Sequence, residues 1–371
     1  MKRHSQHLDT SILVCEIGPF ESEGGVSRSV LVITLLFRLL GFRVKLIPLS
    51  KQQLLRPAYL HGCNVIHVHS QLLFEYIMIL FKVPRSIKIL TLHGWVLEEQ
   101  IIYLRYMYDV PLVKRIISTF FVFISWLINK LIFIPFTVHI VTAVSKITAE
   151  KNKVNAIKTI NPFIEYYIRK QIKECNELNK SNNEIWITSY VSIGGGKILS
   201  IPRIVKVAVI LNKLLENKGK KVVLHIFGKD IPKWLEELYL EYDPAVKIMH
   251  YRRDYICYLK NSDLFIAGYT MPELGHAIIE AISLGVPIAK YSEDPADEEI
   301  IDGFNGIVAQ NDSDMVRKLY EYIMSINEKR AVLAKNAKIT ILRKRLINYN
   351  YVKVIWYTIL KHCLKTINKS T

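Results

Sequence analysis

The chain has 371 residues, a length that predicts two domains, each large enough to bury a core of its own. Half of the residues are apolar, which excludes an intrinsically disordered chain. The net charge of +17 indicates partners that carry negative charge, such as phosphates, nucleic acid or an acidic membrane face.

The five cysteines are scattered along the chain, and none forms a CxxC pair. This pattern predicts reduced thiols and argues against a zinc site or a disulfide framework. The polar residues 1–10 lead directly into a short predicted strand and show no signal-peptide pattern. Together these features predict a cytoplasmic protein.

Residues 11–18 are expected to form the first buried strand, and residues 30–40 a helix. Gly24 and Gly25 lie between them and would let backbone amides approach an anion closely near the start of the helix. A phosphate-binding loop and an ordinary turn are the two interpretations of this glycine pair, and the pair by itself favours the turn.

The strand and helix pattern recurs through residues 64–70 and 86–95, which predicts a growing parallel sheet. His69 and His93 each stand at the carboxyl end of an apolar run. Ligands bind at that edge of open α/β sheets, so both histidines are candidates for a functional site. The alternative is a structural histidine held by a hydrogen bond.

Residues 96–136 depart from this pattern and form an apolar and basic insert. Its last part, residues 116–136, is long and apolar enough to be compared with a transmembrane helix. Three interpretations stay open: helices at an interfacial or acceptor-facing surface, a helix in the core, and a membrane span. Aromatic residues with basic flanks favour the interfacial surface, and a span is favoured least because it would divide a βα domain.

Residues 137–151 are expected to restore the pattern with a strand and a helix capped by Ser145. The polar residues 170–183 are the best candidate for a linker between two domains. The second domain then opens with a strand that runs into three glycines, 194–196, followed by Lys197. This second glycine-rich turn is again compatible with a phosphate.

The most informative stretch is residues 262–287. A short apolar run predicts a strand, and a helix is expected from about Leu274 until Gly285 stops it. Glu273 lies at the start of this helix and Glu280 two turns further on. The arrangement places carboxylates at a strand end, beside helix-terminal N–H groups that favour anions.

This stretch resembles the acidic signature of the retaining nucleotide-sugar glycosyltransferases of the GT-B fold, the glycosyl transferases group 1. In that signature two glutamates, with seven residues between them, precede an alanine and a Gly-x-Pro. Glu273 and Glu280 have six residues between them, so the loop is one residue shorter here. His93 followed by a glycine, and the glycine pair after the first strand, fit the same family.

The resemblance implies an α/β protein with two Rossmann-like domains, whose parallel sheets face a central cleft. It also implies a C-terminal helix that crosses back to the first domain. With the linker above, the expected parts are residues 1–169, 184–345 and the C-terminal helix 346–371.

By resemblance, His93 and Glu273 are the catalytic residues that hold the donor sugar, and Glu280 binds the ribose. Lys197 and Arg203 have the six-residue separation of a diphosphate-binding pair in relatives. Their flanking residues differ, and Arg203 is alternatively a charge at a helix start. The full set of implied donor-binding residues is Gly24, Gly25, Lys197, Arg203, Gly275, His276 and Glu280.

The implied reaction transfers a hexose from a UDP- or GDP-sugar to a glycan or lipid-linked acceptor, with retention of configuration and without a metal ion or cofactor. The insert 96–136 adds an anionic membrane surface as a partner, which would make the protein peripheral on the inner membrane face. One alternative is a catalytically silent scaffold, which the short glutamate spacing allows. Others are an epimerase or trehalose-phosphate-type synthase of the same fold, and a nucleic-acid-binding protein, disfavoured because no array of exposed aromatics and basic residues lies outside the insert.

Overall fold

The computed structural model of the chain separates into two compact units, each described here by itself. The first unit comprises Met1–Leu97, Ile117–Phe163 and Arg345–Thr371, and the second comprises Glu98–Ile116 and Ile164–Lys344. The structure describes residues 12–18, 25–48, 60–69, 86–94, 100–101, 103–105, 110–128, 130–131, 134–160, 162–192, 200–229, 231, 237, 245–250, 252, 254–268, 275–292, 299–347 and 350–370.

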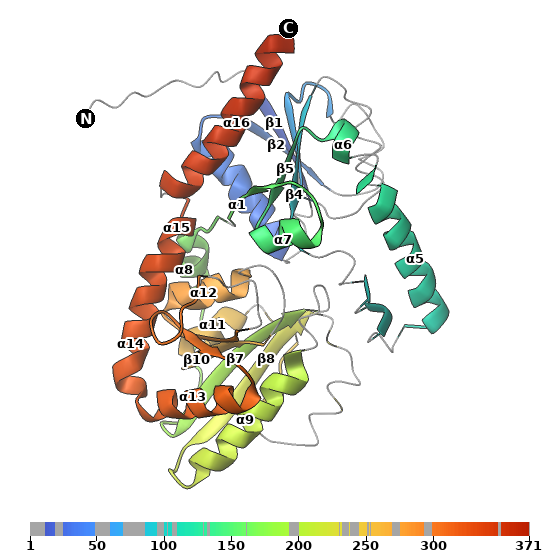
Figure 1. Cartoon of the computed structure of the whole chain (residues 1–371). Coiled ribbons are helices and arrows are strands. Elements are labelled where there is room, and N and C mark those ends of the chain that lie inside the picture. Colours follow the sequence, from blue (N-terminus) through green and yellow to red (C-terminus); the bar gives the residue numbers. More distant parts are fainter. Residues whose placement is uncertain are drawn as a thin grey trace, which may run out of the picture. The chain divides into compact units, whose positions relative to one another are not determined.

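The first unit is built on a six-stranded parallel sheet with the strand order β2-β1-β3-β4-β5-β6 (Figure 1). Short apolar runs rich in valine and isoleucine form its strands, as expected for a sheet covered on both faces. The strands are β1 (Leu13–Gly18), β2 (Arg43–Pro48), β3 (Val65–Val68), β4 (Ile87–Leu92), β5 (Ile140–Ala143) and β6 (Ile157–Lys158).

The helices of the first unit include the last helix of the chain. Among the described helices, α1 (Gly25–Leu39), α6 (Ile134–Thr137), α7 (Lys146–Lys151) and α16 (Asn350–Ser370) lie wholly in this unit. Ser145 caps α7 by accepting a hydrogen bond from the backbone N–H of Thr148, as the sequence predicts. The ring of Trp356, on α16, is buried 5.3 Å from the ring of Phe37 on α1. The C-terminal helix therefore packs on the first unit, as the fold resemblance implies.

The second unit contains another six-stranded parallel sheet, in the order β12-β11-β10-β7-β8-β9. Its strands are β7 (Glu184–Ser192), β8 (Lys221–Lys229), β9 (Val246–Ile248), β10 (Leu264–Ala267), β11 (Ile288–Tyr291) and β12 (Ile307–Ala309). The two sheets confirm the predicted fold class of two Rossmann-like domains.

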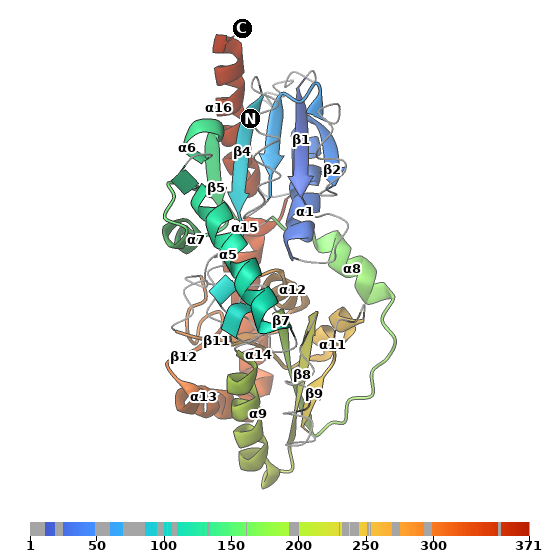
Figure 2. The same cartoon turned by 90° about the vertical axis from the view of Figure 1, so that its right-hand side faces the viewer.

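Helices cover both faces of the second sheet (Figure 2). One face carries α9 (Ile201–Glu216) and α13 (Asp312–Met324), and the other carries α11 (Tyr255–Asn261) and α12 (His276–Leu284). Helix α8 (Glu165–Lys173) packs against α11 and α12. The chain then continues through α14 (Ile326–Ala337), a π-helical turn (Lys338–Leu342) and α15 (Arg343–Arg345).

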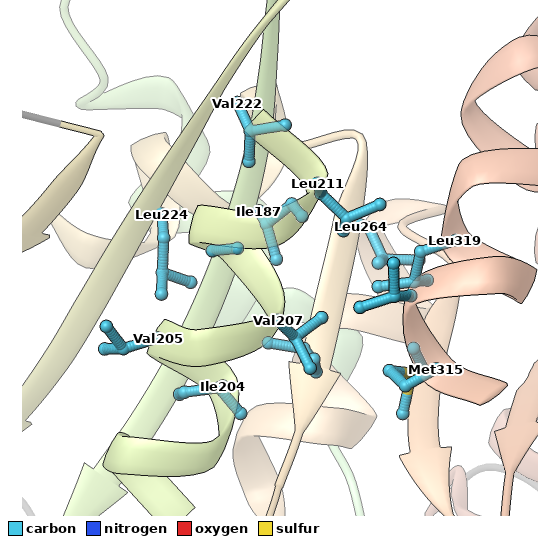
Figure 3. Packing of buried hydrophobic residues seen from close by; sticks show 14 of the residues in the cluster. Ile187, Ile204, Val205, Val207, Leu211, Val222, Leu224, Leu264, Met315 and Leu319 are labelled. Carbon is cyan, nitrogen blue, oxygen red and sulfur yellow. The ribbon is translucent and has the colours of Figure 1, made fainter. Parts of the chain in front are cut away.

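The core of the second unit lies between the sheet and helices α9 and α13 (Figure 3). Alternate strand residues such as Ile187 and Leu224 point toward α9. Ile204 and Leu211, which lie on one face of α9, pack in the same cluster. Each fully buried side chain of this kind stabilises the unit by roughly 1.5–3 kcal/mol. This packing fixes where α9 begins relative to the strand ends.

The prediction of reduced thiols is wrong for four of the five cysteines. Disulfides join Cys15 to Cys63 and Cys175 to Cys257, and Cys363 is free and buried. The paired residues are 48 and 82 positions apart in sequence, so no local sequence pattern predicts the two disulfides. They meet because β1 lies beside β3, next to which Cys63 stands, and because α8 packs against α11.

The apolar insert forms helix α5 (Leu112–Ile128), most of whose described side chains are exposed or half-buried. Phe120 and Phe121 are 60% and 66% exposed, which excludes the interpretation as a core helix. Arg115 is its one buried residue in the described part and donates to the carbonyl oxygen of Leu104 at 2.7 Å. Among the described helices, none combines the length and apolarity needed to cross a membrane.

Candidate functional sites at two sheet edges

Each sheet has one place where the chain reverses the direction in which strands are added. In the first unit the chain goes from β1 to β2 and then to β3 on the other side of β1. In the second unit it goes from β7 through β8 and β9 and returns to β10 on the other side of β7. Ligands of open α/β sheets bind at the carboxyl ends of the strands at such switch points.

At the first of these switch points, Gly18 ends β1 where helix α1 and His69 approach closely. A Cβ atom on Gly18 would stand 2.6 Å from Val30 Cγ2 and 3.3 Å from His69 Cβ. The backbone N–H of His69 donates to the carbonyl oxygen of Ile17 at 2.9 Å, which continues the pairing of β1 and β3. The glycine therefore lets the histidine lie directly beside the end of β1.

A buried network of polar side chains starts beneath this edge. Both oxygens of the Glu16 carboxylate accept hydrogen bonds, Oε1 from His67 Nδ1 at 3.0 Å and Oε2 from His69 Nε2 at 2.8 Å. The other nitrogen of His69, Nδ1, lies 3.0 Å from His93 Nε2. All four side chains are buried. The sheet thus links the predicted residue His93 to a carboxylate two strands away.

A second arm of the network runs deeper into the sheet. His67 Nε2 lies 2.6 Å from Thr91 Oγ1, which lies 2.6 Å from Thr142 Oγ1. The Cα atoms of Glu16 and His67 are register partners, as are those of Thr91 and Thr142. Side chains two residues apart on a strand share one face, so the network crosses β1, β3, β4 and β5 on a single face of the sheet.

Aromatic side chains from two helices cover the network on one face of the sheet. The ring centroid of Trp356 is 5.1 Å from that of His67, and the ring of Phe37 is 5.9 Å away from it. Because helices α16 and α1 supply these rings, water is kept from the carboxylate. In such surroundings every hydrogen bond of the network is stronger than at the surface.

The pKa values of the network follow from burial together with the charges and hydrogen bonds within it. Burial by itself raises the pKa of Glu16, but the charge of His67 and the hydrogen bonds from His67 and His69 outweigh it and lower the value to about 2. Burial, and then the charge of His67, lower the pKa of His69 to about 4 against the opposing effect of Glu16. At neutral pH, Glu16 is therefore ionised and His69 is neutral.

Glu16, His67 and His69 also bring three atoms of metal-ligating type within 4.8 Å of one another, a grouping that arises within the described part of the chain. Two of these contacts are already hydrogen bonds between imidazole N–H groups and the carboxylate. The geometry is that of a hydrogen-bonded network, and each of the three side chains has its partners within it.

At the switch point of the second unit, α9 and α12 begin beside neighbouring strand ends. A Cβ atom on Gly268, just after β10, would stand 2.6 Å from Ile204 Cγ2 and 2.9 Å from Ser200 Cβ, so the strand end touches the first turn of α9. The N-cap of α12 is Gly275, which offers no side chain to its first N–H groups. Such N–H groups favour an anion.

The structure places three predicted residues on α12 or at its start. Gly275 is the N-cap, His276 is the first helical residue and Glu280 is in the second turn with 2% of its surface exposed. Such burial is unusual for a glutamate, which is rarely buried unless it is paired. The prediction that Glu280 binds the ribose stays a prediction.

Arg203 lies in the first turn of α9 and takes part in interactions within the second unit. Its Nε donates to Asp312 Oδ1 at 2.8 Å, and its guanidinium stacks 3.5 Å from the centre of the Tyr291 ring. Burial raises the pKa of Asp312, but the hydrogen bond from Arg203 and further favourable interactions outweigh it and lower the value. The sequence gives no sign of this pair, which links α9 to α13.

Several predicted residues cannot be placed. Gly24, Lys197 and Glu273 lie outside the described residues, and Gly25 is described only as the first residue of α1. His93 is placed with the buried network of the first unit and Glu280 with the edge of the second. Sequence reasoning missed Glu16, His67, Thr91 and Thr142, although polar residues at every second position of VIHVH and ILTLH are a signal for one polar face in a buried strand.

Comparison with known proteins agrees with this architecture. Residues 201–340 match the family model described as glycosyl transferases group 1. No curated protein matches the sequence. The matched segment contains α9, β10 and α12, and therefore most of the described elements around the second switch point.

Three solved structures resemble the chain over nearly its whole length. A glycosyltransferase from Rickettsia africae has a TM-score of 0.65 at 16% identity and covers 95% of this chain and 99% of its own. HepE of Anabaena, in complex with UDP and glucose, has a TM-score of 0.65 at 14% identity and covers 94% and 100%. A sucrose-phosphate synthase from Thermosynechococcus elongatus has a TM-score of 0.64 at 13% identity and covers 96% and 100%.

At these identities the structural similarity establishes the fold, and the family match adds sequence evidence for the second unit. The resemblance of residues 262–287 to the glycosyl transferases group 1 and their GT-B fold is thereby confirmed. The chain has the GT-B fold, and its residues 201–340 carry the sequence of the glycosyl transferases group 1.

Proposed function

We propose that this protein transfers a sugar from a nucleotide diphosphate-sugar to an acceptor, with retention and without a metal ion. The observation that carries the proposal is the family match over residues 201–340, which includes the buried Glu280 at the switch point of the sheet. HepE, which shares the fold, was crystallised with UDP and glucose, and this supports a uridine nucleotide as the first donor to test.

In the proposed sugar transfer, the protein must stabilise the departing nucleoside diphosphate. The N-terminal N–H groups of α9 and α12 would meet the phosphate oxygens, with Lys197 adding a positive charge. Glu280 would accept hydrogen bonds from the ribose hydroxyls, in surroundings where shielding from water makes them strong. His93 and Glu273 would hold the donor sugar. These fixed charges and dipoles supply the transition-state stabilisation that a metal ion supplies in other transferases.

A nucleotide panel tests the donor site directly. We expect UDP or GDP, and the matching nucleotide sugar, to raise the melting temperature of the wild type, because a ligand at 100 times its Kd stabilises by about 2.7 kcal/mol. Glu280→Gln keeps the shape of the side chain but removes its charge, and should weaken binding by about 10- to 100-fold. Differential scanning fluorimetry with added EDTA would report both effects.

The matched control is Glu321→Gln, an exposed glutamate on α13 that should leave the nucleotide response unchanged. If no nucleotide stabilises the wild type, the result contradicts the transferase proposal and supports the alternative of a catalytically silent scaffold. Loss of binding in EDTA that added Mg²⁺ restores would overturn metal independence.

We further propose a lipid-linked acceptor at an anionic membrane surface, contacted through α5. The rings of Phe120 and Phe121 are adjacent and exposed to solvent, and their centroids are 6.2 Å apart. Residues 110–149 contain no acidic side chain, while Lys114 and Lys130 provide positive charge. Exposed aromatic residues with basic flanks are typical of helices that lie in the membrane interface.

Vesicle binding tests this surface. The double variant Phe120→Ser, Phe121→Ser should lose at least 10-fold in affinity for vesicles that contain phosphatidylserine, because each buried aromatic ring contributes about 1.5–3 kcal/mol. Ile210→Ser with Leu214→Ser, two exposed residues of α9, should bind as the wild type does. Binding should also fall at high salt. Equal sedimentation of the wild type with and without vesicles would contradict the proposal.

A further inference from the structure

We propose that a cavity at the edge of the first sheet binds a fatty-acid anion, with its carboxylate at Lys158 and His139 and its alkyl chain along helix α16. All the residues that line this cavity belong to the first unit. Strands β3 and β4 separate it from the switch point at β1. The inference therefore goes beyond the proposed function and does not depend on it.

The cavity lies where the last strand of the sheet is too short to cover its neighbour. Its volume is about 700 Å³, and small-molecule sites measure roughly 300–1,000 Å³. Residues 139–141 and 155–158 line it on the side of the sheet. Among the described strands, β6 alone adjoins the outer side of β5, and it pairs only with Thr142 and Ala143. The outer side of Ile140 and Val141 is therefore left open to a ligand.

Helix α16 forms the opposite wall. Val354, Thr358 and His362 line the cavity at steps of four residues, and Ile355 and Ile359 lie beside them. The helix rises by about 12 Å from the first of these residues to the last. The cavity is thus elongated along the helix, a shape that suits an extended alkyl chain.

The walls of the cavity are aliphatic. Ile140 and Ile359 are buried, whereas Ile157 and Val354 are 49% and 59% exposed. Covering such apolar surface with an apolar ligand is favourable. No phenylalanine, tyrosine or tryptophan is among the described residues that line the cavity, so it offers no large ring on which a nucleobase could stack. The walls therefore favour an alkyl chain over a nucleotide.

The charge at the cavity is positive. Lys158, on β6, is exposed and makes no ion pair with another residue in the described part of the chain. No aspartate or glutamate is among the described residues that line the cavity. The ammonium group of Lys158 is thus left to attract an anion, and hydrogen bonds between charged groups are the strong ones.

His139 supplies a second hydrogen-bond donor. Its Nδ1 accepts from the backbone N–H of Lys88 at 3.2 Å. Burial, and then the charge of Lys88, lower the pKa of His139, so the ring is neutral at pH 7 and carries its proton on Nε2. An ionised carboxylate only accepts hydrogen bonds, and it can accept from both Lys158 and His139. The polar residues therefore suit the head group of a fatty acid as the walls suit its chain.

Decanoate is the probe, and decan-1-ol and butyrate are controls that lack its charge and its long chain. In protein labelled at the isoleucine methyl groups, decanoate should shift the signals of Ile157, Ile355 and Ile359, which isoleucine-to-valine variants assign. Both controls should bind at least about 10-fold more weakly, because each loses one of the two kinds of contact. Equal affinities for decanoate and decan-1-ol would overturn the inference.

Substitutions at exposed positions test the two ends of the site without disturbing the core. Lys158→Gln should weaken decanoate binding by about 10-fold, and Lys158→Arg should restore it. Val354→Glu places a carboxylate in the apolar wall and should weaken binding by at least about 10-fold. Lys361→Gln changes an exposed lysine of α16 that does not line the cavity, and it should bind as the wild type does. Equal affinities in all four variants would overturn the inference.

Vesicles distinguish a free fatty acid from a membrane lipid. Lys158→Gln should bind phosphatidylserine vesicles as the wild type does, because that contact is proposed for α5. If decanoate does not bind to the wild type, or if Lys158→Gln loses affinity for vesicles only, the inference is wrong. These titrations need no sugar transfer, so a failure of nucleotide binding would overturn the proposed function and leave the fatty-acid site to its own test.

Discussion

Acidification from pH 7 to pH 2 is expected to cost the first unit about 6 kcal/mol of stability through two groups of the buried network. The folded pKa of His69, about 4, lies below its usual 6.5, so the unfolded chain binds more protons and stability falls as the pH drops from 6.5 to 4. The folded pKa of Glu16, about 2, lies below its usual 4.5, so its contribution is lost between 4.5 and 2. Each shift corresponds to about 3 kcal/mol.

Urea unfolding at several pH values, followed by circular dichroism, would measure this loss. Burial, and then the charge of Lys247, also lower the pKa of His225 in the second unit to about 4, so the wild-type curve alone would mix the two units. The comparison with His69→Gln isolates the network, because this variant should lose about 3 kcal/mol less between pH 6.5 and 4. Identical pH profiles for the two proteins would contradict the lowered pKa of His69.

Replacing Trp356 with alanine should destabilise the first unit by about 4 kcal/mol. The side chain is fully buried, and its removal would leave a cavity beside Phe37 and over His67. Losses of about 3–5 kcal/mol are typical for buried tryptophan replaced by alanine. The cavity would also admit water to the carboxylate of Glu16, so the variant should unfold at lower urea concentration, as measured by far-UV circular dichroism.

Two variants on the same helix test the cause of that loss. Val354→Ala removes an apolar side chain that is 59% exposed and should change stability by no more than about 0.5 kcal/mol. Trp356→Phe keeps a ring in place and removes an indole N–H that has no hydrogen-bond partner among the described residues. It should therefore cost clearly less than Trp356→Ala. Equal losses for Val354→Ala and Trp356→Ala would show that α16 contributes through its helix and not through this ring.

The sequence predicts the order of strands and helices well because apolar runs and glycine turns are local signals. Residues 262–287 show this: the short strand appears as β10, and Gly285 adopts the left-handed conformation that ends α12. Such elements predict a parallel sheet, and the resemblance of residues 262–287 to a known family adds the two-domain fold class. The donor contacts predicted for Gly24, Lys197 and Glu273 stay predictions, because these residues lie outside the described part of the chain.

The buried network could be predicted only in part. His69 and His93 stand at strand ends and attract attention there, but Glu16 is a single acid inside the apolar run SILVCEIG. Only the register of β1 against β3 places it opposite His67. The disulfides were missed for the same reason, since strand register and helix packing bring together cysteines that are 48 and 82 positions apart.

The membership of α16 in the first unit has a consequence for how a newly made chain folds. Synthesis runs from the N-terminus, and at about 5–20 residues per second the second unit, Ile164–Lys344, takes about 10–35 s to emerge. During that time β1, β3 and β4 already exist, but Trp356 is not yet there to cover Glu16 and His67. The second unit can therefore complete its core first. The first unit is synthesised earlier, but its buried network is covered only after the last helix leaves the ribosome.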